Sequence, residues 1–155
     1  MNQPPKMKIR LRLVIIKNEK LLAYYDSMDN YYFYIGGKLE FGETLEEGWT
    51  REIREELGED VVFTFKKILY VRDFIIKEED EHSLELFILG DINKFAEIEG
   101  RPDPEFEGKK WPTWLDINNL PDSLLPKALS PKLLRDYKDG FGLTGEYIGK
   151  MDKQE

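Results

Sequence analysis

The hydrophobic residues of this 155-residue chain change their spacing after a pair of glycines, and this change restricts the fold most strongly. Before Gly36 and Gly37, apolar residues alternate with charged ones, as in a β-strand with one buried face: Ile9, Leu11, Leu13 and Ile15. After the glycines, apolar residues recur at every fourth position and form one stripe of an α-helix: Leu45, Trp49, Ile53 and Leu57. Thr44 is placed to cap the start of this helix, and Gly58 to end it.

The remaining elements are predicted from the same two periods and from turn residues. A hairpin turn at residues 17–20 should follow the first strand, and more strands are expected at residues 21–25, 31–35, 61–76, 83–92 and 111–115. The segment 61–76 is compatible with two short strands or with one long bent strand. Ser130 and Pro131 are typical of a helix start, so a second helix is expected to run to Lys138.

This order of elements indicates the fold class. Strands, one central helix, further strands and a terminal helix favour an α+β sandwich in a single domain over residues 1–155. The core is expected to span about residues 7–138, and residues 139–155 to form a charged tail that is partly disordered at its end.

The composition excludes several kinds of site. The chain has no cysteine, which rules out disulfides, thiolate nucleophiles and cysteine-ligated metals, and its single histidine rules out a multi-histidine metal site within one chain. A formal net charge of −8 is unfavourable for binding nucleic-acid phosphates by charge alone. No window holds the ~20 apolar residues of a transmembrane helix, and residues 1–8 do not look like a signal peptide. We therefore expect a cytoplasmic protein without a membrane or nucleic-acid partner.

Three glutamates of the central helix are predicted to lie close together. Glu52, Glu55 and Glu56 occupy positions i, i+3 and i+4, which places them within an arc of roughly 100° at the edge of the apolar stripe. Carboxylates this close repel one another unless a cation lies among them, and a hard divalent metal is the usual remedy. Arg51 could hold one carboxylate through its planar fork of donors. The competing interpretation is a solvated helix face with i, i+4 ion pairs, but it leaves the double glycine and Glu43 unexplained.

Together these residues resemble the Nudix box. Eight of its nine defined positions match at the required spacing: Gly37, Glu43, Arg51, Glu52, Ile53, Glu55, Glu56 and Gly58. The ninth position, normally a bulky aliphatic residue, is Glu59. A match at this many spaced positions is a specific signal, unlike a lone glycine pattern. With its flanking strands and the closing helix, the resemblance covers roughly residues 7–138.

The resemblance implies a Nudix-type α/β/α sandwich with a mixed sheet and a loop–helix–loop catalytic motif. It implies hydrolysis of a pyrophosphate bond in a nucleoside diphosphate linked to another moiety, with Mg²⁺ or Mn²⁺ as cofactor. The implied metal ligands are Glu52, Glu55, Glu56 and the backbone of Gly37. Glu43 would be an auxiliary ligand or would order the metal-bound water, and Arg51 would orient Glu52.

Alternatives to an active hydrolase remain open on sequence grounds. A Nudix-like domain could bind a nucleotide as a sensor without cleaving it, although the intact box favours catalysis. The glutamates could also form a structural site stabilised by calcium. Homodimers are common in the family, so a second copy of the chain is a further candidate partner beside the small-molecule nucleotide.

Relatives often place one more acid in a loop outside the box. The corresponding loop of this chain covers residues 93–110, and its acids are Glu97, Glu99, Asp103, Glu105 and Glu107. Glu107 is the first candidate for a catalytic role and Glu105 the second. For either one the competing interpretation is an ordinary solvated loop acid.

Contacts to the substrate outside the box are harder to assign. Relatives often carry an arginine at the end of the strand 21–25, where it can meet phosphate, but this chain has Tyr24 and Tyr25. Other candidate phosphate partners, each of which could equally be a charge on a sheet face, are Arg10, Arg12, Lys38 and Arg72. An aromatic ring from residues 31–34 could stack on a base.

Overall fold

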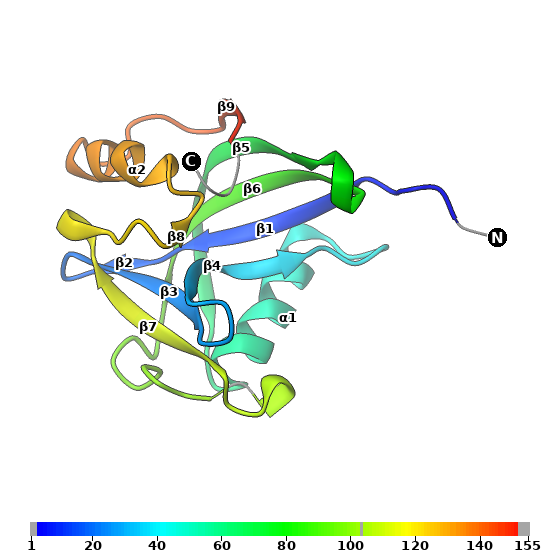
Figure 1. Ribbon diagram of the computed structural model, residues 1–155. Helices are drawn as coiled ribbons and strands as arrows, with labels where there is room; N and C mark the ends of the chain where they lie inside the picture. Colours follow the sequence, from blue (N-terminus) through cyan, green and yellow to red (C-terminus); the bar gives the residue numbers. More distant parts are fainter. Residues whose placement is uncertain (1–2, 103, 152–155) are drawn as a thin grey trace.

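A mixed sheet of nine strands forms the centre of the computed structural model, which describes residues 3–102 and 104–151 (Figure 1). The strands are β1 (Lys8–Val14), β2 (Ile16–Lys17), β3 (Lys20–Asp26), β4 (Tyr31–Lys38), β5 (Phe63–Ile76), β6 (Glu81–Ile92), β7 (Lys110–Asp116), β8 (Leu124–Leu125) and β9 (Glu146–Lys150). Their order across the sheet is β2–β3–β4–β1–β6–β5–β9, while β7 pairs with β3 and β8 with β4. The helices are α1 (Leu45–Leu57), α2 (Leu129–Lys138) and the 3-10 turns η1 (Lys77–Glu79), η2 (Pro104–Phe106) and η3 (Ile117–Asn119).

The two α-helices pack on opposite faces of the sheet. Alternation along β1 sends Leu11 and Leu13 into a core with Ile53 of α1, and Val14 into a second core with Leu129 of α2. The sheet is therefore the middle layer of an α/β/α sandwich, and the predicted fold class is confirmed (Figure 1).

Strand β4 joins the two halves of the sheet beside the glycine pair. Its first half, from Tyr31 to Tyr34, pairs with β3, and its second half pairs with β1. In this register Gly36 lies opposite Arg12 and Gly37 opposite Leu11. The loop that leads into α1 is therefore anchored next to β1.

The C-terminal third differs from the prediction at the start of α2 and contains two strands that were not predicted, β8 and β9. Helix α2 begins at Leu129, one residue before the predicted cap, because the completely buried Leu129 side chain anchors its first turn. Ser130 and Pro131 therefore lie inside that turn, where proline is tolerated because the N–H groups have no intrahelical partner. Within the predicted tail, β9 pairs in parallel with β5, and the end of the tail, residues 152–155, lies outside the described residues.

The segment 61–76, for which one or two strands were compatible with the sequence, contains the single long strand β5. Two register shifts against β6, between Phe65 and Lys67 and between Ile68 and Tyr70, allow it to bend. Within the described residues, no helix combines the length and the apolar character needed to cross a membrane.

Candidate active site

Helix α1 begins and ends at the residues predicted from the sequence. The Glu47 N–H donates to the Thr44 hydroxyl (3.1 Å), and the Thr44 N–H donates to the Glu47 carboxylate (3.2 Å). Reciprocal capping of this kind stabilises a helix by about 1 kcal/mol. Gly58 ends the helix with a φ of 122°, and its N–H donates to the Arg54 carbonyl (3.2 Å). Because Ile53 points into the core, the glutamates that precede and follow it lie at the edge of the buried face.

The glycine pair before α1 lets the backbone of β4 approach the helix closely. A Cβ atom at Gly37 would lie 2.7 Å from Glu52 Oε1, and one at Gly36 would collide with the Leu11 carbonyl oxygen. Gly36 also has a φ of +135°, which residues with a side chain rarely adopt. Its N–H donates to Glu56 Oε1 (2.7 Å). The glycines therefore bring two of the three glutamates directly against the β4 backbone.

Arg51 lies at the centre of a cluster of carboxylates. Its Nε and Nη2 atoms donate to the two oxygens of Glu43, at 2.8 and 2.9 Å. Its Nη1 atom donates to Glu52 Oε1 (2.9 Å) and to Glu55 Oε2 (3.4 Å). The hydrogen bond from Arg51, assisted by one from the Glu40 N–H, lowers the pKa of Glu43 to about 2. Arg51 thus contacts Glu52, as expected, and it also holds Glu43 in its charged form.

The three glutamates differ in their exposure to solvent. Glu52 is only 7% exposed, and burial raises its pKa, an effect that the hydrogen bond from Arg51 partly offsets. Glu55 is exposed and Glu56 is half-buried. A bound divalent cation would favour the charged form of Glu52 and relieve the cost of its burial.

Glu52, Glu55 and Glu56 line one pocket of about 340 Å³, which we call the carboxylate pocket. The rest of its lining comes partly from β4, with Phe33 and Tyr34, and partly from residues farther away in the sequence, among them Arg12, Tyr24, Asp26 and Lys110. Of the two tyrosines that stand where relatives often carry an arginine, only Tyr24 is in this lining.

Asp26 and Lys110 are pocket residues that the sequence analysis did not single out. They lie opposite each other on β3 and β7, and their charged atoms are 3.7 Å apart. Opposite charges at the ends of the two strands predicted at residues 21–25 and 111–115 are the signal that could have indicated this pair.

The long loop before β7 brings Glu105, and not Glu107, to the carboxylate pocket. Glu105 lies in η2 and is part of the pocket lining. Both side chains are exposed, but Glu107, which has a positive φ of 54°, is not in that lining. Glu97 and Glu99 are not in the lining either, and Asp103 lies outside the described residues.

This site suits a metal ion because of the kind of ligand atoms that it offers, and not because its side chains are already arranged around a metal position. Among the described residues, no three acidic or histidine side chains are arranged around a common point as metal ligands. Arg51 binds oxygens of Glu43 and Glu52, and the Gly36 N–H binds one of Glu56. The donor set nevertheless suits a hard divalent cation, because carboxylate oxygens line one pocket and Arg51 balances only part of their charge.

Comparison with known proteins identifies the class to which this fold and site belong. The NUDIX domain model matches residues 8–135, so the chain belongs to the NUDIX domain family. No curated protein matches the chain in sequence.

Solved structures share the fold at low sequence identity. A MutT NUDIX hydrolase from Burkholderia pseudomallei is 21% identical with a TM-score of 0.64, over 84% of this chain and 97% of that one. An ADP-ribose pyrophosphatase from Streptococcus suis is 16% identical with a TM-score of 0.64, over 90% and 98% of the two chains. A UDP-X diphosphatase is 20% identical with a TM-score of 0.66, over 95% and 68%.

Proposed function

We propose that this NUDIX-family enzyme hydrolyses a pyrophosphate bond in a nucleoside diphosphate linked to another moiety, with Mg²⁺ or Mn²⁺ as cofactor. The observation that supports this function is the carboxylate pocket, in which three box glutamates stand beside Arg12. The names of two proteins with similar folds point to the same substrate class, ADP-ribose for one and UDP-X for the other. Neither identifies the substrate of this chain.

Within this proposal, Glu52, Glu55 and Glu56 hold the metal, joined by the Gly37 carbonyl. When bound, the cation neutralises pyrophosphate charge and lowers the pKa of a coordinated water. Arg51 keeps Glu52 in position, and Glu43 in turn keeps Arg51 in position, since both Glu43 oxygens accept from it.

For the acid outside the box we propose Glu105 in place of Glu107, because Glu105 lines the carboxylate pocket. From there its carboxylate can accept a proton from the attacking water or add a metal ligand. Because Glu105 lies on the loop between β6 and β7, its approach to the substrate depends on how that loop packs.

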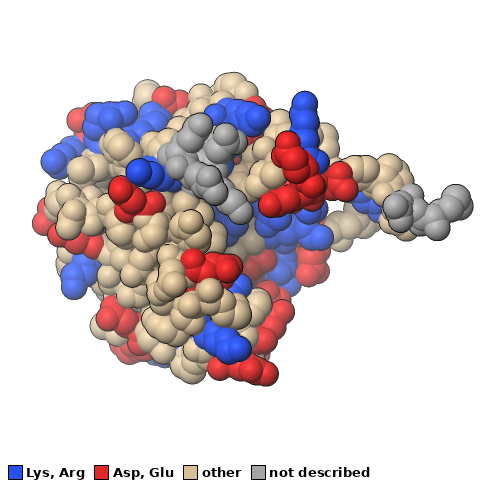
Figure 2. Space-filling model, viewed as in Figure 1, with Lys and Arg blue, Asp and Glu red and all other residues tan. Residues whose placement is uncertain are grey.

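The partners that we propose are small nucleotides and not nucleic acid. Acidic and basic side chains are interspersed over the face shown in Figure 2, without a continuous basic surface across it. We place the reaction in the cytoplasm on the basis of the cysteine-free composition. A homodimer would be compatible with this function, and gel filtration would test it.

The test of this function is product release from a substrate panel. ADP-ribose, a UDP-sugar, a dinucleoside polyphosphate and coenzyme A are incubated with the protein and Mg²⁺, Mn²⁺, Ca²⁺ or EDTA, and the nucleotide products are quantified by chromatography. We expect product from at least one substrate with Mg²⁺ or Mn²⁺ and none with EDTA. Nucleotide binding without any product would favour the sensor alternative. Thermal stabilisation by Ca²⁺ alone, with neither product nor nucleotide binding, would favour a structural calcium site.

A further inference from the structure

A second pocket adjoins the carboxylate pocket on the far side of Arg12, and we call it the arginine pocket. Its volume is about 230 Å³, and it shares Arg12, Phe33 and Tyr34 with the carboxylate pocket as a common wall. Small-molecule sites typically measure about 300–1,000 Å³, so the two pockets together suit a ligand longer than a pyrophosphate group. A substrate held at the box glutamates can therefore extend past Arg12 into the arginine pocket.

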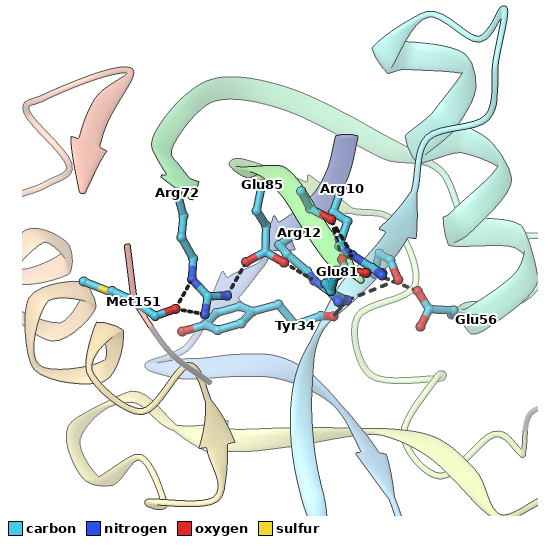
Figure 3. Close-up of polar contacts among 10 residues, drawn as sticks. Arg10, Arg12, Tyr34, Glu56, Arg72, Glu81, Glu85 and Met151 are labelled. Carbon is cyan, nitrogen blue, oxygen red and sulfur yellow. Dashed lines mark hydrogen bonds and ion pairs between the residues drawn. The ribbon is translucent and has the colours of Figure 1, made fainter. Parts of the chain in front are cut away.

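Buried ion pairs form the polar wall of the arginine pocket. Glu85 of β6 accepts from Arg12 Nε at one oxygen (3.2 Å) and from Arg72 Nη1 at the other (2.7 Å), as Figure 3 shows. Arg72 is 2% exposed, and its Nε atom donates to the Met151 carbonyl (2.8 Å), just beyond β9. Arg12 Nη1 also donates to the Tyr34 carbonyl (3.1 Å). Two arginines that the sequence offered as phosphate partners thus share one carboxylate.

Aromatic rings form the apolar part of the same pocket. Phe33, Phe74 and Phe87 are in its lining, and the Arg72 guanidinium lies over the Phe74 ring at 4.5 Å from the centroid. The buried hydroxyl of Tyr34, another lining residue, has no hydrogen-bond partner among the described residues. Phe87 is fully buried, so a planar ligand can stack on the half-buried rings of Phe33 and Phe74 while its edge reaches the polar groups.

The charge balance of the arginine pocket disfavours the binding of a phosphate group there, in addition to the pyrophosphate proposed for the carboxylate pocket. Its lining holds equal numbers of acidic and basic side chains: Glu79, Glu81, Glu85, Arg10, Arg12 and Arg72. Arg10 is paired with Glu81 (3.0 Å), so its charge is already balanced. An anion would meet three carboxylates, whereas a neutral ligand meets acceptors and donors side by side.

A heterocycle with a ring N–H beside a carbonyl group complements this arrangement. Its N–H can donate to a Glu85 oxygen, which has a second lone pair, while its carbonyl oxygen accepts from an arginine N–H. Guanine and uracil have such a lactam edge, and adenine and cytosine do not. Discrimination is strong where a buried polar group would otherwise lose its partner.

We propose that Arg72 and Glu85 are specificity-determining residues, and that they select a nucleotide whose base presents a ring N–H beside a carbonyl group. The proposal rests on the proposed function only for the location of the pyrophosphate group at the box glutamates. Met151, just beyond β9, contributes to the same site, because its carbonyl oxygen accepts from Arg72 and holds that side chain against Glu85.

Binding of nucleoside 5′-monophosphates tests this selection without any hydrolysis, since these ligands have no pyrophosphate bond. Calorimetry with Mg²⁺ compares guanosine, uridine, adenosine and cytidine monophosphates with ribose 5-phosphate. We expect the guanosine or the uridine ligand to have a Kd at least tenfold lower than those of the adenosine, cytidine and base-free ligands. Equal affinity for all four nucleotides, or none tighter than ribose 5-phosphate, would overturn the proposal. Base selection by a protein that cleaves no substrate would overturn only the proposed function.

Two variants and one control assign the selection to these residues. Arg72→Lys keeps a charge beside Glu85 but loses the planar fork, so we expect the base preference to fall below threefold. Phe74→Ala removes an aromatic wall and should weaken nucleotide binding at least tenfold without changing ribose 5-phosphate binding. Phe65→Ala is the matched control, because Phe65 lies on the same strand but stacks on Trp49 outside the pocket lining.

Thermal melting accompanies each of these measurements. A merely structural Arg72 would lower the melting temperature of Arg72→Lys and leave the ratio of base affinities unchanged, and that result would also overturn the proposal.

Discussion

The carboxylate pocket and the arginine pocket share a wall but are assembled in opposite ways. The box side of the carboxylate pocket comes from residues 36–58, and the hydrogen bond from Gly36 to Glu56 joins positions only 20 apart. In the arginine pocket, the bond between Arg12 and Glu85 joins positions 73 apart, and that between Arg72 and Met151 joins positions 79 apart. One pocket is a local motif, and the other exists only after the sheet has formed.

Their electrostatics differ as well. The carboxylate pocket gathers the three box glutamates, and Glu52, which Arg51 contacts from outside the pocket lining, is costly to charge until a cation binds. The arginine pocket pairs its charges internally and leaves directional hydrogen-bonding groups. This difference suits the first pocket to chemistry on phosphate and the second to recognition of a neutral polar group.

The largest expected effect is the loss of turnover when a box glutamate is neutralised. Glu56→Gln should lower kcat by about 10³-fold, or about 4 kcal/mol, because it removes a ligand of the proposed metal. Steady-state kinetics and circular dichroism would show whether turnover falls while the fold survives. Glu46→Gln, an exposed acid in the first turn of the same helix, is the control. Near-normal turnover in Glu56→Gln would refute the assignment of chemistry to the carboxylate pocket.

Metal binding should raise the melting temperature through the carboxylate pocket only. At a concentration of 100 times Kd, Mg²⁺ or Mn²⁺ should add about 2.7 kcal/mol, which is roughly 5–10 °C for a domain of this size. Since burial raises the pKa of Glu52, the shift should grow with pH as this carboxyl ionises.

Two variants show which of the two pockets binds the metal. Glu52→Gln should blunt the shift in melting temperature, whereas Phe74→Ala should leave it intact. An equal shift in wild type and Glu52→Gln would mean that the metal binds elsewhere.

A smaller effect distinguishes the two loop acids. Glu105→Gln should lower kcat about tenfold, or about 1.4 kcal/mol, with less change in KM, because the acid acts on the attacking water or the metal. Glu107→Gln removes the same charge from the same loop outside the pocket lining and should change kcat less than twofold. Equal losses in the two variants would indicate a general charge effect, and a larger loss in Glu107→Gln would restore the sequence-based choice.

The smallest expected effect concerns acid stability, to which Glu43 beside the carboxylate pocket and Glu81 in the arginine pocket contribute. The pKa of Glu43 is lowered to about 2 chiefly by its bond with Arg51. Burial alone would raise the pKa of Glu81, but hydrogen bonds from Arg10, Lys8 and a neighbouring serine lower it to about 2. A lowered carboxyl pKa stabilises the fold fully above the unfolded value of 4.5, and this stabilisation is lost as the pH falls from 4.5 to about 2.

Urea unfolding between pH 2 and pH 7 would measure this dependence. Glu43→Gln and Glu81→Gln should each reduce the free energy of unfolding at pH 7 and match wild type near pH 2. A difference that stays constant across this range would contradict the lowered pKa values.

The sequence by itself was enough to predict the α/β/α sandwich, the limits of α1 and the grouping of the three glutamates. The limits of α1 and the grouping of the glutamates depend on contacts within one helix and its preceding loop, where the period of 3.6 residues and the Thr44 and Gly58 caps are already sufficient. The sandwich was implied by the resemblance of this segment to the Nudix box. The family assignment follows from the same segment, because the box specifies spacing along the chain and not pairing across it.

Only the tertiary structure decided which residues meet this segment from outside. Glu105, and not Glu107 with its left-handed backbone, lines the carboxylate pocket. Helix α2 starts at the buried Leu129, one residue earlier than predicted. Strand β9 could not be predicted from the sequence, because the tail has little hydrophobic pattern. Its stability comes from pairing with β5 and from the hydrogen bond between Arg72 and Met151, and not from local β-propensity. In the sequence, Arg12, Glu85 and Arg72 are charges on separate strands. They meet only because β6 pairs with both β1 and β5, since sheet register sets contacts between residues that are distant in the chain.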